Sequence, residues 1–151
     1  MTGLRLDTEV IEERLAHLQD GLEVLSKYQG TTRQDLEDDT ELRWLDQHGI
    51  LTSVQVVLDL SNHLVAAMDV ESPRDYRGAI LALARLGILP TEFAERISGM
   101  AGLRNVIVHE YAAVDQSVVS NVLNQRLGDF AEFGRHVREF VKRHEQKQRD
   151  E

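Results

Sequence analysis

Residues 50–68 read ILTSVQVVLDLSNHLVAAM and form the longest predominantly apolar stretch of the chain. Its apolar residues recur at steps of three and four, as they do along the faces of an α-helix. They form two rows, one with Leu51, Val54, Leu58, Val65 and Met68, the other with Ile50, Val57 and Leu64. A helix that is apolar on more than one face lies at the centre of a bundle, or is shared between a core and a dimer interface. The stretch therefore predicts an all-α protein built around a central helix.

Helical spacing continues on both sides of the central helix, and no sustained period-two alternation appears. About five helices are predicted, beginning near residues 8, 40, 72, 90 and 115. Ser72 and Pro73 are typical of a helix start, Thr40 is a candidate cap, and Gly49 marks a point where the central helix can kink. Gly99 is expected to bend or split the fourth helix. Short connections between long helices predict one antiparallel bundle, a single domain over residues 1–151.

Arg33 to Asp39 is expected to be a connector or a short helical turn, and the charged tail 142–151 is expected to fray. The formal net charge of -9 argues against a broad surface for polyanions, so any nucleic-acid site must be small and local. The absence of cysteine excludes disulfides, thiolate zinc sites and cysteine nucleophiles. No apolar run approaches the roughly 20 residues that span a bilayer. We therefore expect no membrane partner and a cytoplasmic location.

The segment Arg104-Asn105-Val106-Ile107-Val108-His109-Glu110-Tyr111 combines residues that suit phosphate chemistry. On a helical wheel, Arg104, Asn105, His109 and Tyr111 form a polar arc, although a helix end near His109 would release Tyr111 from it. Arginine offers a fixed fork of donors to phosphate oxygens, and histidine exchanges protons near neutral pH. Such residues also meet by chance on amphipathic helices, so spacing alone leaves both a functional site and an ordinary helix surface open.

The same segment resembles the R-x4-H-x-Y motif of HepT-like proteins, a branch of the HEPN superfamily. The resemblance covers about residues 42–140 and includes the stretch from Val56 to Leu64, the Gly-Ile-Leu turn at 87–89 and the lead Gly102-Leu103 into the motif. It implies a HEPN-like bundle that forms a homodimer and cleaves RNA without a cofactor or metal. Arg104 and His109 would then be the catalytic pair, and Asn105 would position the substrate.

The resemblance also implies a regulated toxin. In the HepT–MntA type of toxin–antitoxin pair, a small nucleotidyltransferase, the MntA-like antitoxin, adds AMP to the motif tyrosine, which here is Tyr111. The added phosphates would bring negative charge and bulk into the RNA site. The alternative is a non-catalytic HEPN module that binds a nucleotide or serves as the partner subunit of a nucleotidyltransferase, and the acidity of the chain favours it slightly.

Asp59, Asn62 and His63 form a second polar group on the central helix. Asp59 and His63 are four residues apart and share a face, which predicts a hydrogen-bonded pair rather than a metal site. If the family geometry holds, Asp59 or Asn62 would support the RNA cleft. Trp44 and Tyr28 could stack on bases, but each is expected to be an ordinary packing residue.

Overall fold

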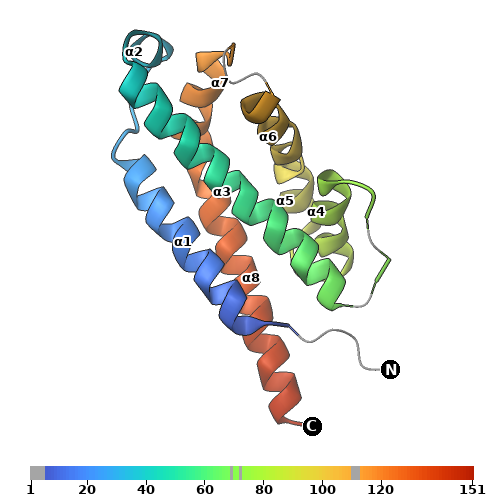
Figure 1. The fold of residues 1–151 in the computed structure, drawn as a ribbon. Coiled ribbons are helices and arrows are strands. Elements are labelled where there is room, and N and C mark those ends of the chain that lie inside the picture. The colour runs from blue at the N-terminus through green and yellow to red at the C-terminus, as the bar shows by residue number, and fades with distance from the viewer. Residues whose placement is uncertain (1–5, 69, 72, 110–112) are drawn as a thin grey trace.

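The computed structural model describes residues 6–68, 70, 71, 73–109 and 113–151, and within these ranges it contains helices and no strand (Figure 1). The α-helices are α1 (Thr8–Ser26), α2 (Arg33–Asp38), α3 (Thr40–Ala67), α4 (Tyr76–Arg85), α5 (Thr91–Ile97), α6 (Met100–His109), α7 (Gln116–Asn121) and α8 (Leu127–Arg149). A π-helical turn, Val122–Arg126, joins α7 to α8. The predicted all-α bundle is confirmed.

The predicted central helix is α3, which crosses the whole bundle (Figure 1). It packs against α1 on one side and against α4 and α6 on the other, while α8 packs against α1 behind it. Both of its apolar rows are used: Ile50, Val57 and Leu64 are completely buried, and so are Val54 and Leu58. The apolar window of α3 is hydrophobic enough to cross a membrane by composition, but 61% of it is buried inside the bundle. This is the burial expected of a core helix.

Aspartates begin several of the helices. The side chain of Asp7 accepts a hydrogen bond from Val10 N at α1, Asp39 accepts from Leu42 N at α3, and Asp75 accepts from Gly78 N at α4. The predicted cap Thr40 is thus the first residue of α3 rather than its cap. The start predicted at Ser72-Pro73 is wrong at Pro73, since α4 begins only at Tyr76, while Ser72 lies outside the described residues.

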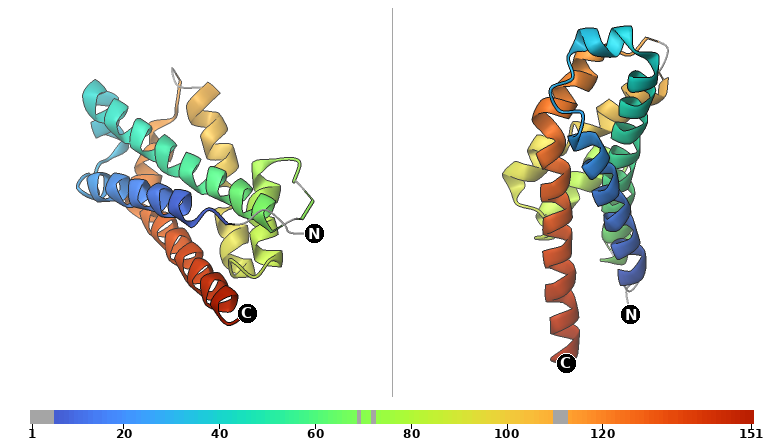
Figure 2. Two further views of the ribbon diagram at one scale, coloured as in Figure 1. Left: turned by 60° about the horizontal axis from the view of Figure 1, so that its bottom comes forward. Right: turned by 90° about the vertical axis from the view of Figure 1, so that its left-hand side faces the viewer.

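The predicted connector at 33–39 is the short helix α2, and a capping box between Thr32 and Asp35 stabilises its N-terminus. The fourth predicted helix is split at Gly99 into α5 and α6, as expected. The predicted last helix is divided by the π-helical turn, and its charged end stays helical to Arg149 instead of fraying. This end extends past α1, away from the rest of the bundle (Figure 2).

Gly49 does not kink α3, which runs unbroken from Thr40 to Ala67. It allows close packing instead: a Cβ atom at Gly49 would lie 2.7 Å from Cδ2 of Leu25, a buried side chain of α1. Gly21 of α1 faces α3 with more room, because a Cβ atom there would lie 3.7 Å from Oγ of Ser53. A Cβ atom therefore fits between the two helices at Gly21, whereas at Gly49 it would require Leu25 to move.

Candidate functional site

The segment that carries the predicted chemistry forms α6, which lies along α3. Ile107 is buried in the core, Asn105 is exposed and Arg104 is partly exposed, so the predicted division into apolar and polar faces holds for these residues. The described part of the helix reaches His109. The side chain of His109, together with Glu110 and Tyr111, lies outside the described residues.

Arg104 is held in place by side chains from two other helices. Its Nε atom donates a hydrogen bond to Oε1 of Gln55 on α3 at 2.8 Å, and its Cζ atom lies 5.6 Å from the centre of the Tyr76 ring at the start of α4. This second contact has cation–π geometry. Neither Gln55 nor Tyr76 was singled out from the sequence. The sequence offers one hint for Gln55: it precedes Asp59 by four residues, which places both on the same face of α3.

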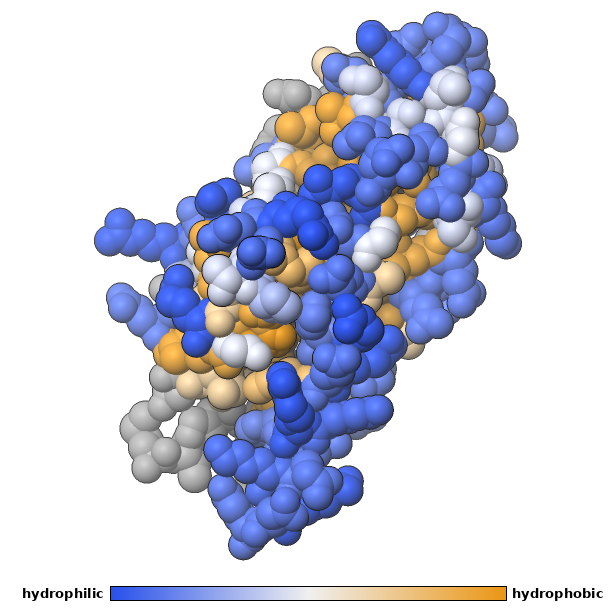
Figure 3. Space-filling view, turned by 180° about the vertical axis from the view of Figure 1, so that it is seen from behind, coloured by the Kyte–Doolittle hydropathy of each residue, from blue (hydrophilic) through white to orange (hydrophobic). Residues whose placement is uncertain are grey.

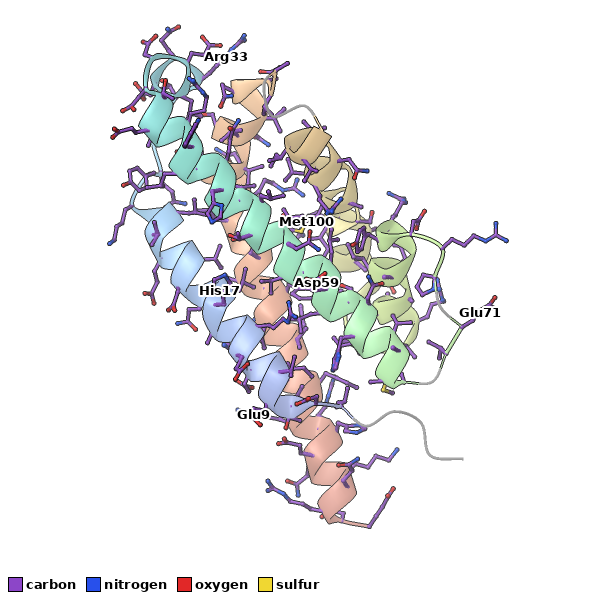
Figure 4. All side chains as sticks on the ribbon, in the orientation of Figure 1. Glu9, His17, Arg33, Asp59, Glu71 and Met100 are labelled. Atoms are coloured by element: carbon purple, nitrogen blue, oxygen red, sulfur yellow. The ribbon has the colours of Figure 1, made fainter. Side chains whose placement is uncertain are left out.

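Asp59 also contacts Gln55, the residue that binds Arg104, and it does not pair with His63. It accepts a hydrogen bond from Nε2 of Gln55 at 2.8 Å, and its other oxygen lies 3.3 Å from Nη1 of Arg14 on α1. Nε2 of His63 is buried and has no hydrogen-bond partner among the described residues. The predicted Asp59–His63 pair is therefore wrong, because Gln55 and Arg14 satisfy the carboxylate. Figure 4 labels Asp59 on α3, between α1 and the helices that carry Arg104 and Tyr76.

Asn62 is exposed on α3, one turn beyond Asp59, and Asn105 is exposed on α6. Within the described part of the chain, neither side chain makes a hydrogen bond to the Arg104 group. Asp59 thus contacts Gln55, the residue that binds Arg104, whereas Asn62 and Asn105 stay at the surface.

An open cavity of about 420 Å³ lies beside the same two helices and is lined by Trp44, His48 and Leu51 of α3 and by Ile107 and Val108 of α6. Trp44 is 74% exposed, so the expectation that it packs in the core is wrong. On α3, Trp44, His48, Leu51 and Gln55 follow one another at steps of three and four, which puts the cavity and the contact to Arg104 on one face. The surface seen from behind has further apolar patches among hydrophilic side chains (Figure 3).

Asp46 is a buried acid on the core side of α3. It is 0% exposed, and both carboxyl oxygens lack a hydrogen-bond partner among the described residues. Burial raises the pKa of Asp46 to about 6, since a charged carboxylate is poorly solvated in the core.

Across the described residues, no group of three or more His, Asp or Glu side chains has the arrangement of a metal site.

Solved structures with the same architecture include HEPN toxins. The chain resembles the tri-AMPylated HEPN toxin of Shewanella oneidensis, solved in complex with an MNT antitoxin, with a TM-score of 0.76 and 20% identity over 85% of this chain and 96% of that one. It also resembles YutE, a cytosolic protein of unknown function from Bacillus subtilis, with a TM-score of 0.81 and 14% identity over 93% and 94% of the two chains. The predicted HEPN-like fold is thus confirmed.

Two relatives of this chain in sequence are nucleases named HepT. The tRNA nuclease HepT of Aphanizomenon flos-aquae is 24% identical over 138 residues, which cover 90% of this chain and 92% of that protein. The mRNA nuclease HepT of Shewanella oneidensis is 27% identical over 79 residues, 52% of this chain and 59% of that one. The sequence profile of the family described as ribonuclease HepT-like matches residues 18–137. This chain therefore belongs to the HepT-like ribonuclease family.

Proposed function

We propose that this chain is the endoribonuclease toxin of a toxin–antitoxin pair, that it cleaves RNA without a metal ion, and that Arg104 and His109 are its catalytic residues. The observation that carries the proposal is the setting of Arg104. In a chain of the ribonuclease family, an arginine five residues before a histidine is held on the surface of α6 through its Nε atom and ring contact. Its Nη atoms donate to no side chain that the structure describes, so they are available to a phosphate.

The chemistry follows from the donors of these two residues and from the 2′-hydroxyl of RNA. The 2′-oxygen would attack the neighbouring phosphorus, form a 2′,3′-cyclic phosphate and release the 5′-oxygen of the next nucleotide. His109 would accept the proton of the 2′-hydroxyl or supply the proton of the leaving oxygen. Arg104 would stabilise the charge that develops on the phosphoryl oxygens. The need for a 2′-hydroxyl would make the enzyme selective for RNA over DNA.

A homodimer accounts for how these side chains meet at one phosphate. Five residues turn an α-helix by about 140°, so positions 104 and 109 fall on different sides of a single helix. A second copy of α6 facing the first would bring two arginines and two histidines to one cleft. The same arrangement concentrates positive charge locally, which a protein of net charge -9 needs in order to hold RNA. Asn105, exposed on α6, would contact the substrate in this cleft.

The proposed partner is an MntA-like nucleotidyltransferase antitoxin that adds AMP to Tyr111. Tyr111 is seven positions from Arg104 in the sequence, and phosphates on its hydroxyl would compete with RNA for the positive charge of Arg104. The HEPN toxin with the same fold was solved in an AMPylated state in complex with its antitoxin, which supports this partner class.

The direct test incubates the purified chain with total tRNA in EDTA and analyses product ends. Discrete cleavage with 2′,3′-cyclic phosphate ends is expected of the wild type, and its loss is expected of Arg104→Ala and His109→Ala, with unchanged helix content by circular dichroism. Cleavage by His109→Ala at the wild-type rate would contradict the assigned catalytic role. Cleavage that stops in EDTA and returns with Mg²⁺ would contradict the metal-independent mechanism.

The acidity of the chain favours a second candidate, a non-catalytic HEPN module that acts as the partner subunit of a nucleotidyltransferase. This candidate predicts that the wild type cleaves neither tRNA nor mRNA, and that it still forms a tight complex with the nucleotidyltransferase. Size-exclusion chromatography of the mixed proteins, run beside the cleavage assay, separates the two candidates.

A further inference from the structure

Arg104 is the end of a chain of polar contacts that crosses three helices. Its Nε atom donates to Oε1 of Gln55, Nε2 of Gln55 donates to Oδ1 of Asp59, and each of these hydrogen bonds is 2.8 Å long. The second carboxylate oxygen of Asp59 is paired with Nη1 of Arg14 at 3.3 Å. The contacts thus run from α6 through α3 to α1, and Gln55 is the residue that links Arg104 to Asp59.

We propose that Gln55 is a positioning residue of the ribonuclease site, which orients the guanidinium of Arg104 so that its Nη donors face the RNA phosphate. This inference rests on the proposed function, because it takes the phosphate as the ligand of Arg104. An arginine has five N–H donors, and the hydrogen bond to Gln55 uses only the one on Nε. The two Nη groups at the far end keep four donors, which form a fork that matches two phosphate oxygens.

The chemistry of an amide explains why glutamine suits this position. The amide oxygen accepts from Arg104 while the amide nitrogen donates to Asp59, so both ends of the side chain are fixed. The amide is neutral, so it holds the guanidinium without cancelling its charge. Asp59, which carries the negative charge, contacts Gln55 rather than Arg104, and Arg14 balances that charge. Arg104 therefore keeps its positive charge for the substrate.

Tyr76 adds a second contact, with Cζ of Arg104 over its ring at 5.6 Å from the ring centre. Together with the hydrogen bond to Gln55, this contact restricts the rotation of a long side chain, and ordering such a side chain costs conformational entropy. Because this ordering takes place when the protein folds, it does not weaken RNA binding later. The structure thus presents Arg104 in a fixed orientation before the substrate arrives.

The test compares two substitutions at Gln55 with a matched control. Gln55→Leu keeps most of the side-chain volume but removes both hydrogen bonds. Gln55→Glu keeps an acceptor for Arg104, loses the donor to Asp59 and adds a negative charge between the two. The control is Gln34→Leu: on α2, Nε2 of the exposed Gln34 donates to Oδ1 of Asp38, four residues later, at 2.9 Å, which is the same kind of pair far from Arg104 in the sequence.

Two kinds of readout are measured for each variant. The first is functional: the rate of cleavage of total tRNA, and the affinity for a 2′-deoxy oligonucleotide that cannot be cleaved. The second is the exchange rate of the Arg104 Nε–H proton by NMR, whose signal is assigned because it is absent from the spectrum of Arg104→Lys. We expect Gln55→Leu to lower kcat about 10- to 100-fold and to speed up Nε–H exchange. We expect Gln55→Glu to keep the proton protected while affinity for the oligonucleotide falls about tenfold, and Gln34→Leu to match the wild type.

The two readouts separate failure of this inference from failure of the proposed function. If wild type does not cleave RNA, the proposed function fails, and Nε–H exchange still reports whether Gln55 orients Arg104. A Gln55→Leu variant that cleaves at the wild-type rate, or keeps Nε–H fully protected, overturns the positioning role. If Gln55→Leu does not fold, Gln55→Glu decides: unchanged affinity for the oligonucleotide, or lost protection of the proton, overturns the proposal.

Discussion

Arg104 on α6 donates a hydrogen bond from Nε to Oε1 of Gln55 on α3, across 49 positions of sequence. Lysine cannot replace this arginine, because its single ammonium group has no planar fork that can bond Gln55 and bind a phosphate at the same time. We expect Arg104→Lys to lower kcat/KM for tRNA cleavage about 100-fold although the charge is kept. Initial rates measure this, with Arg33→Lys on the exposed α2 as control. Wild-type activity of Arg104→Lys would mean that charge alone is enough.

Tyr111→Phe should separate cleavage from neutralisation. The phenylalanine has no hydroxyl to accept AMP, while the proposed chemistry needs Arg104 and His109. We expect the variant to cleave RNA as the wild type does and to gain no AMP when it is incubated with ATP and an MntA-like nucleotidyltransferase. Intact-protein mass spectrometry measures the AMP additions, and Tyr28→Phe serves as control. AMP additions on Tyr111→Phe equal to those on wild type would contradict the assigned acceptor.

The buried Asp46 should make the stability of the fold depend on pH. Its pKa is about 6 in the folded protein against an ordinary value of 3.8, so the folded state holds this proton more tightly than the unfolded state does. Asp46 therefore lowers the free energy of unfolding as pH rises through the window from about 4 to 6, and the cost remains above it.

Asp46→Asn removes this titration, because asparagine is neutral at every pH in the window. We expect the variant to gain stability relative to wild type by roughly 2 kcal/mol between pH 4 and pH 8. Urea unfolding of both proteins at the two pH values measures the difference, in which the titrations of all other groups cancel. A stability difference that does not change with pH would show that Asp46 titrates normally.

Two glycines at the contact between α1 and α3 should respond differently to alanine. At Gly21 the new Cβ has room beside Ser53, so Gly21→Ala should stabilise the protein by about 0.5–1 kcal/mol through helix propensity. At Gly49 the new Cβ would meet Leu25 at 2.7 Å, so Gly49→Ala should destabilise it by about 1 kcal/mol. Thermal unfolding compares the two. Equal gains at both positions would mean that Leu25 moves aside freely.

Helix starts were harder to predict than helix cores, and the reason is local chemistry. The apolar rows of residues 50–68 predicted the central helix, since a helix that is apolar on two faces needs packing partners on both of them. Thr40 and Asp39 are neighbours that both cap helices well, and the structure uses Asp39. Likewise, Asp75 caps α4, two residues after the predicted first helical position Pro73.

Helical periodicity and a motif are properties of neighbours along the chain, so the sequence was enough to predict the helical class, a central helix at the position of α3, and the segment with Arg104 that forms α6. Only the tertiary structure decided that Arg104 is held by Gln55 and Tyr76, that Asp59 binds Gln55 and Arg14 instead of His63, and that Trp44 is exposed. These contacts depend on how α1, α3, α4 and α6 cross one another. Spacing along one helix carries no information about that crossing, since it is set by the packing of side chains from all four helices.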